Sequence, residues 1–206
     1  MATSDHLDEI YDRLHRSGPE FDGWLSNHGP MAADALARVG RGERVDAWLD
    51  AYLPRLEAMP ARRWPIDETE WREALGDPAR LGDWIGWFAD QLGNRPWRDV
   101  LAQWWPRLLP GGIASATNPL IRTGHAVRAL DEHDSPTRRD ELPHALGYWA
   151  ARWQPLPGGT RPAGQATTRA ALAACLRSVA KEGSARASRR SPTPRTGRPP
   201  RPPCGR

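Results

Sequence analysis

The chain has 206 residues, of which 39% are hydrophobic, and a formal net charge of +4. This length allows one ordinary domain with a substantial core, together with a tail. Two cysteines, Cys175 and Cys204, exclude a disulfide framework and a cysteine zinc site. No segment approaches the ~18 consecutive apolar residues of a membrane helix, and the acidic N-terminus has no apolar signal core. We therefore expect a cytoplasmic protein with no membrane partner.

The charge is distributed unevenly along the chain. Residues 181–206 contain Lys181 and seven arginines against Glu182, a net charge of +7, so the first 180 residues sum to −3. A slightly acidic body is not typical of a nucleic-acid-binding domain, and the tail has no aromatic residue on which a base could stack. We predict no specific nucleic-acid partner.

Apolar residues recur at helical spacing in segments that are separated by Gly and Pro. Helices are expected at residues 4–15, 30–39, 43–56, 71–75, 77–92, 96–109, 120–130 and 137–153. Pro54 should kink or divide the third of these. Residues 67–70 resemble a capping box, and Thr137 is the expected cap of the last helix. Because no alternating β-branched run of strand length occurs, the predicted fold is all-α, a multi-helix orthogonal array.

The composition changes after Gln154, where a linker rich in Pro and Gly begins. We predict a helical domain over residues 1–165 and an Ala-rich helical segment over residues 166–182. Residues 183–206 consist of Ser, Arg, Pro and Gly with almost no hydrophobe, so they cannot bury enough surface to offset the entropy of ordering. They are expected to form a disordered basic C-terminal tail.

The stretch from Gly111 to Leu130 is the segment around which the chain is expected to be organised. A Gly pair marks a turn, Thr117 can act as N-cap, and Pro119 then falls in the first turn. Asn118, Arg122 and His125 stand at i, i+4 and i+7 and so share a helix face. This pattern favours the floor of a polar site, although it also suits a helix whose polar face meets water.

Five of the six histidines divide into two groups, and His144 shares a predicted helix face with Glu141 and Tyr148. His6, His15 and His133 are interpreted as solvated surface groups. His28 and His125 lie beside Gly at a helix start or interior, where a side chain can line a cavity. Neutral imidazole is a good iron or zinc ligand, and histidines from different helices can build a metal site in a helical fold. Spacing alone identifies no metal site, because no His-x-x-x-His or Cys-x-x-Cys pair occurs.

Four segments together resemble the questin oxidase-like family over about residues 5–165. They are residues 26–36 (SNHGPMAADAL), 104–112 (WWPRLLPGG), 119–130 (PLIRTGHAVRAL) and 141–153 (ELPHALGYWAARW). The resemblance implies an NADPH-dependent oxidoreductase that inserts oxygen into, or cleaves, an anthraquinone-like aromatic polyketide by a Baeyer–Villiger-type reaction. Some relatives are non-haem iron enzymes that use several histidines.

The resemblance also implies roles for individual residues. His28 and His125 match motif histidines and are the expected metal ligands, and the two should approach one another across a cleft. Arg122 and His125 are the expected catalytic residues. The predicted substrate pocket is lined by Asn27, Asn118 and Tyr148.

Two departures from the family pattern give an alternative. Asn118 stands where the family pattern has His, and an amide is a poor iron ligand. On the helix, positions 118 and 125 are ~10 Å apart along the axis, which favours a pocket in which Arg122 holds a phenolate or carboxylate. Family members are also longer. The alternative is therefore a truncated, catalytically incomplete helical domain that binds an aromatic ligand or a partner without turnover.

Overall fold

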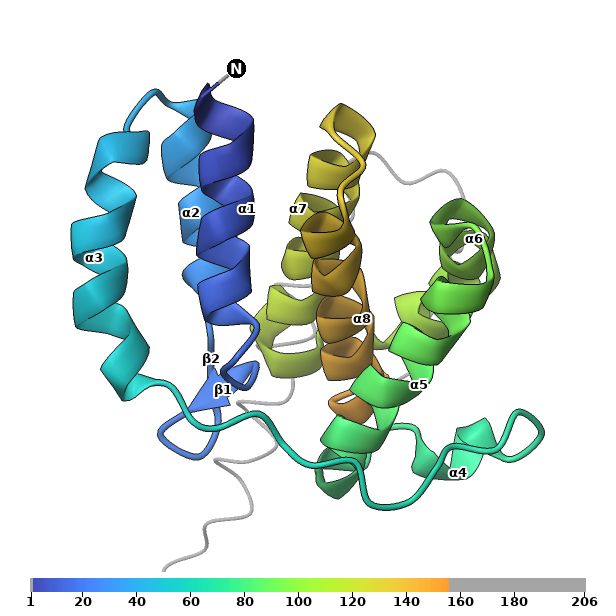
Figure 1. The fold of residues 1–206 in the computed structure, drawn as a ribbon. Coiled ribbons are helices and arrows are strands. Elements are labelled where there is room, and N and C mark those ends of the chain that lie inside the picture. The colour runs from blue at the N-terminus through green and yellow to red at the C-terminus, as the bar shows by residue number, and fades with distance from the viewer. Residues whose placement is uncertain (1, 156–206) are drawn as a thin grey trace, which may run out of the picture. The chain divides into compact units, whose positions relative to one another are not determined.

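The computed structural model describes residues 2–155, and side chains from residue 6 onward. The described part of the chain contains eight α-helices and one short two-stranded sheet (Figure 1). The helices are α1 (Ala2–Leu14), α2 (Gly29–Arg38), α3 (Val45–Tyr52), α4 (Trp71–Ala74), α5 (Leu81–Asn94), α6 (Trp97–Leu108), α7 (Asn118–Glu132) and α8 (Pro136–Ala151). The all-α prediction is confirmed. The boundary at residue 165, the segment 166–182 and the tail 183–206 lie outside the described residues.

The small sheet was not expected from the sequence. Strand β1 (Glu20–Phe21) pairs antiparallel with β2 (Leu25–Ser26), with Glu20 opposite Ser26. Asp22 and Gly23 make the turn between the strands, both at positive φ. Two residues per strand are too few to show an alternating pattern, which is why the sequence carried no strand signal. Among the described residues, no helix is long and apolar enough to cross a membrane.

Several expected helix boundaries are confirmed. Helix α2 has Pro30 in its first turn, where the missing N–H has no helical partner to lose. Gly40 and Gly76 follow α2 and α4 at φ values of 72° and 81°, a conformation that is costly for residues with a Cβ. Pro54 divides the third predicted helix, because α3 ends at Tyr52 and a 3-10 turn (Leu53–Arg55) follows.

Two predicted helix caps are wrong. Residues 67–70 do not cap α4, because this helix begins at Trp71 with Glu70 at its N-cap and no side-chain cap bond. Asp67 Oδ1 instead accepts a hydrogen bond from the N–H of Thr69 at 2.7 Å, two residues away. Ser135 rather than Thr137 caps α8, and its hydroxyl accepts from the N–H of Arg138 at 3.2 Å. A short polar side chain can bond nearby backbone groups in several ways, so sequence spacing alone does not decide between them.

Helix α8 occupies the centre of the described helices, a position that the sequence suggested for residues 111–130. Every residue from Glu141 to Ala151 is buried, as expected for a helix covered on all sides. It packs against α5, α7 and α1 (Figure 1). The contact with α5 is made close by Gly147, where an added Cβ would lie only 2.7 Å from Cγ1 of Ile85.

The apolar core has two parts, one on each side of α8. The larger one is built around Trp104, whose ring centroid lies 4.9–5.6 Å from the rings of Trp71, Trp84, Trp87 and Phe88, all edge to face. Such pairs contribute beyond the area they bury. The smaller part joins α1, α2 and α3 and is formed by residues that include Leu7, Ile10, Tyr11, Leu14 and Leu49.

Candidate functional site

Helix α7 begins with an unusual backbone. Ser115, Ala116 and Thr117 have φ values of 43°, 53° and 69°, in the left-handed region that non-glycine residues rarely adopt. Thr117 stands at the N-cap position as predicted, but its side chain makes no cap bond. The turn is held instead by Asn118, whose Nδ2 donates to the carbonyl of Ser115 at 2.8 Å. Strained backbone of this kind persists where its surroundings over-determine it, frequently at functional sites.

Two residues predicted to line the substrate pocket are fully engaged inside the protein. Asn27 donates to the carbonyl of Gly18 at 3.0 Å and accepts from the N–H of Gly29 at 2.9 Å. The hydroxyl of Tyr148 is hydrogen-bonded to Ser26 Oγ at 2.7 Å, and burial raises its pKa. Both side chains tie the β1–β2 segment to its surroundings, and their roles in a pocket stay predictions.

The three polar residues that were predicted to share one face of α7 contact three different partners. Asn118 bonds the preceding turn. Arg122 is buried and forms two hydrogen bonds with Glu141 of α8, from Nε at 2.5 Å and from Nη2 at 2.9 Å. His125 points instead to Asp34 of α2. The three residues therefore share a helix as predicted, but each side chain is bound by a different part of the protein.

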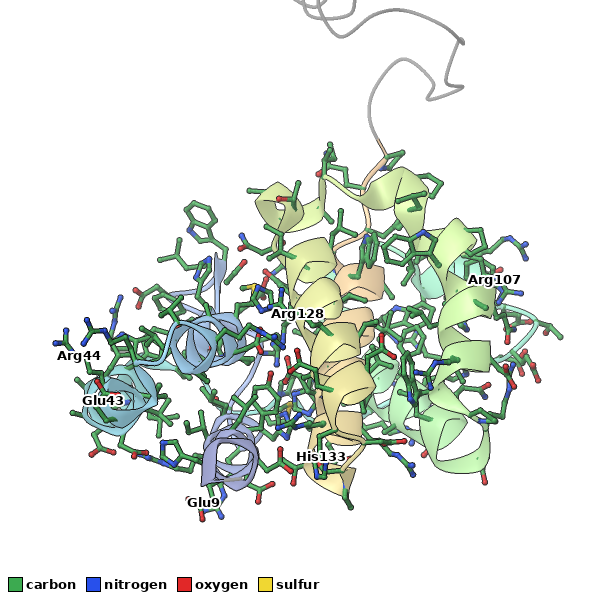
Figure 2. All side chains as sticks on the ribbon, turned by 90° about the horizontal axis from the view of Figure 1, so that it is seen from above. Glu9, Glu43, Arg44, Arg107, Arg128 and His133 are labelled. Carbon is green, nitrogen blue, oxygen red and sulfur yellow. The ribbon has the colours of Figure 1, made fainter. Side chains whose placement is uncertain are left out.

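Asp34 gathers three cationic or polar groups around a carboxylate that is only 1% exposed. His125 Nδ1 lies 2.5 Å from Oδ2 and Arg38 Nε donates to Oδ1 at 2.8 Å. Arg128, on the side of α7 nearest α2 (Figure 2), also donates to Oδ2. Burial alone would raise the pKa of Asp34, but hydrogen bonds from His125 and Arg128 outweigh it and hold the pKa below its usual value. Asp34 is therefore ionised.

The contact with Asp34 fixes the tautomer of His125. Nδ1 of His125 faces two groups, Oδ2 of Asp34 at 2.5 Å and Nη2 of Arg128 at 2.8 Å. The carboxylate contact is the shorter one, and an ionised carboxylate can only accept, so we assign the hydrogen to Nδ1, which donates it to Asp34. The other ring nitrogen, Nε2, has no hydrogen-bond partner among the described residues, and the side chain is 20% exposed. A carboxylate that accepts from one imidazole nitrogen orients the ring and leaves the other nitrogen free as an acceptor. This pair can act as a general base or offer one metal ligand.

A second polar cluster is buried where α1 meets α8. His15 Nε2 lies 2.8 Å from Oε2 of Glu141, and the ring of His15 packs against the rings of His144 at 4.7 Å and Tyr11 at 5.8 Å. The prediction that His15 is a solvated surface group is wrong, because α1 packs against α8 and leaves the side chain only 12% exposed. A signal was available, since His15 lies four residues after the apolar Tyr11 on the same helix face.

Three atoms of this second cluster are buried without a hydrogen-bond partner among the described residues: Tyr11 Oη, Arg122 Nη1 and His144 Nδ1. Burial lowers the pKa of His144 to about 3, so its ring is neutral. Burial, reinforced by Glu141 and Asp34, raises the pKa of Tyr11. Burial would also raise the pKa of Glu141, but Arg122 and His15 hold it well below its usual value. The cluster is a neutral imidazole and a phenol packed against an ion pair.

The two predicted metal ligands differ in their surroundings. His28 is exposed at the start of α2, and its backbone N–H donates to the hydroxyl of Tyr52 at 2.9 Å. Asp34, which is hydrogen-bonded to His125, lies six residues after His28, roughly 9 Å along the axis of α2 at a rise of 1.5 Å per residue. Within residues 2–155, no group of three or more His, Cys, Asp or Glu side chains could hold a metal ion. The approach of His28 to His125 stays a prediction.

An apolar groove runs between α6 and α7. It has a volume of about 410 Å³ and is lined by residues that include Trp97, Leu101, Trp105 and Val127. Trp105 is 38% exposed, and Ile121 of α7 is 46% exposed. Helical periodicity in the sequence does not distinguish a buried apolar face from an uncovered one.

Comparison of the chain with protein-family models, with curated proteins and with solved structures finds no match. The resemblance to the questin oxidase-like family rests on the four motifs alone.

Proposed function

We propose that the chain is an oxidoreductase that inserts oxygen into, or cleaves, the ring of an aromatic polyketide-like substrate. The resemblance names the reaction, and the pair of Asp34 and His125 is the observation that supports it. The two residues come from different motifs of the resemblance, residues 26–36 and 119–130, and their side chains meet at 2.5 Å.

The proposed chemistry at this pair is proton transfer. A hydroxyanthraquinone carries phenolic hydroxyls, and loss of the proton gives an electron-rich phenolate. In the proposal His125 accepts that proton at Nε2 while ionised Asp34 stabilises the resulting imidazolium. Arg122 was expected to hold a substrate anion, but two of its nitrogens already bind Glu141. We therefore assign no substrate contact to Arg122.

The cofactors implied by the resemblance are NADPH and, in some relatives, non-haem iron. The described residues do not fit an iron site of three or more ligands, so no step is derived through a metal. NADPH remains part of the proposal only through the resemblance.

The experiment measures oxygen uptake and substrate loss with 1,8-dihydroxyanthraquinone and NADPH, with and without Fe(II). We expect turnover by the wild type and a loss of about 100-fold or more in His125→Gln, the usual effect of removing a general base. His133→Gln is the control, because His133 is exposed directly after the same helix, α7, and it should keep wild-type activity. Absence of turnover by the folded wild type, or an active His125→Gln variant, would overturn the proposal.

The second candidate function is binding of an aromatic ligand without turnover, and the groove between α6 and α7 favours it. Its volume of about 410 Å³ lies in the range of small-molecule sites, which are mostly apolar. Titration with the same anthraquinone should then quench tryptophan fluorescence with no oxygen uptake. Trp105→Ala should weaken that binding, whereas His125→Gln should leave it unchanged.

A further inference from the structure

A pocket separate from both polar clusters lies where α5 ends and α6 begins. It has a volume of about 510 Å³ and is closed on one side by the start of α8. Three arginines line it, Arg95, Arg98 and Arg139, together with Asp134. A concave site of this size is large enough for a small molecule rather than a single ion.

Arg95 is the central feature of this pocket. Its guanidinium is partly buried, and Nη1 donates to Oε1 of Gln91 at 3.1 Å and to Oε1 of Gln103 at 2.6 Å. Both partners are neutral amides, and no carboxylate of the described chain pairs with Arg95. The two glutamines therefore orient the guanidinium without neutralising its charge.

The free edge of Arg95 is the one that recognises anions. Nε and Nη2 have no hydrogen-bond partner among residues 6–155, and together they form a planar fork of two parallel N–H groups. Such a fork binds two oxygens of a carboxylate or phosphate at once. A partly buried, oriented arginine with this edge unused is a preformed half of an anion site.

The other charges in the pocket are largely balanced. Arg139 forms two hydrogen bonds with Asp134, at 2.5 and 2.8 Å. Arg98 pairs with Asp131 and stacks on the ring of Trp97, with its guanidinium carbon 4.2 Å from the ring centroid. Three arginines against two aspartates leave a net charge of +1, which is the charge of Arg95.

The start of α6 adds neutral donors at the same place. Pro96, Trp97 and Arg98 line the pocket, and the described residues provide no side-chain cap for this helix. The N–H groups of the first helical residues lack an intrahelical partner and favour a bound anion. These N–H groups only support the site, because the positive charge of Arg95 already favours a negatively charged ligand.

We propose that this pocket binds a phosphate-bearing small molecule, with the Nε–Nη2 edge of Arg95 gripping two phosphate oxygens. A phosphate ester suits the site better than a bare ion because the pocket extends well beyond the reach of one guanidinium. Its source is either a nucleotide or a smaller phosphate compound. The inference does not depend on the proposed oxidoreductase function, because binding is measured without turnover.

The experiment is calorimetric titration of the full chain with three probes: adenosine 2′,5′-bisphosphate, inorganic phosphate and adenosine. We expect both phosphate compounds to bind and adenosine not to bind. Arg95→Gln should weaken phosphate binding by at least about tenfold, as expected for loss of a bidentate charge-assisted contact. Arg44→Gln is the matched control, since Arg44 is an exposed arginine just before α3 (Figure 2) and its loss changes the net charge equally.

The outcomes separate the sources and decide the proposal. Binding of the bisphosphate at least tenfold tighter than that of inorganic phosphate identifies a nucleotide site, and equal affinities identify a smaller phosphate compound. Circular dichroism checks that each variant is folded, and Arg95→Lys, which keeps the charge but not the fork, replaces Arg95→Gln if that variant does not fold. The proposal is wrong if neither phosphate compound binds the folded wild type, or if the Arg95 variant binds like the Arg44 control.

Discussion

His15, in the turn directly after α1, and Glu141 on α8 lie 126 positions apart in the chain, and their side chains meet at 2.8 Å. Glu141 also receives both hydrogen bonds of Arg122 from α7. One buried carboxylate thus links three helices. An ion pair in such a place is costly to break, because the partner left behind is a buried charge with no compensation.

The first prediction concerns this carboxylate. Glu141→Gln keeps the shape of the side chain but leaves Arg122 uncompensated, so we expect a loss of roughly 3–5 kcal/mol in the free energy of unfolding. Urea denaturation at neutral pH measures it. The control is Glu132→Gln, because Glu132 pairs with Arg38 but is 51% exposed, and it should cost at most about 1 kcal/mol. Equal effects of the two substitutions would show that Glu141 does not stabilise the junction.

The second prediction is a pH dependence set by His144. Its pKa falls from 6.5 to about 3 on burial, so between these values the unfolded chain binds more protons than the folded one. The free energy of unfolding should therefore fall as the pH decreases from 6.5, by at most ~1.4 kcal/mol per pH unit from this group. Above pH 6.5 the contribution is constant.

Denaturation at pH 6.5 and pH 5.0 tests this dependence. The interval lies above the usual pKa values of Asp34 and Glu141, whose lowered pKa values weaken stability only at more acidic pH. His144→Leu should reduce the difference in the free energy of unfolding between pH 6.5 and pH 5.0. The substitution His133→Gln, at an exposed histidine, should leave that difference unchanged. An unchanged difference in His144→Leu would contradict the assignment.

The third prediction compares two buried tyrosines. Tyr11 Oη is buried without a hydrogen-bond partner among the described residues, so Tyr11→Phe should leave stability unchanged or raise it by about 1 kcal/mol. Tyr148 Oη bonds Ser26, so Tyr148→Phe should lower stability by about 1–2 kcal/mol. Thermal denaturation of both variants measures the contrast. A loss of more than about 1 kcal/mol in Tyr11→Phe would indicate that its hydroxyl has a bound water partner.

The fourth prediction tests the close approach of α5 and α8. Gly147→Ala places a Cβ 2.7 Å from Ile85 Cγ1 and 2.8 Å from the Ile85 nitrogen, so it should cost about 1–3 kcal/mol by overpacking. Gly93→Ala in α5 meets nothing within 4 Å and should stabilise by about 0.5–1 kcal/mol because Gly is a poor helix former. If both alanines behaved alike, the two helices would not be packed as closely as described.

The sequence by itself determined the local features of this protein. Helical periodicity predicted the all-α class, and Gly40, Gly76 and Pro54 marked the ends and the division of helices. These features follow from backbone sterics and from the spacing of apolar residues over a few turns. The same reasoning placed Arg122 and His125 on one face of α7 and identified His28 and His125 as the histidines to examine.

Only the tertiary structure decided which polar groups meet. Asp34 with His125, and His15 with Glu141, are pairs whose members lie 91 and 126 positions apart. The position of His15 four residues after Tyr11 indicates a buried face, but the group that His15 meets there depends on the helix packed against it. The central position of α8 and the lack of a carboxylate partner for Arg95 within the described residues also depend on how the helices pack. Burial and partnership arise when helices pack, so they depend on contacts between distant segments.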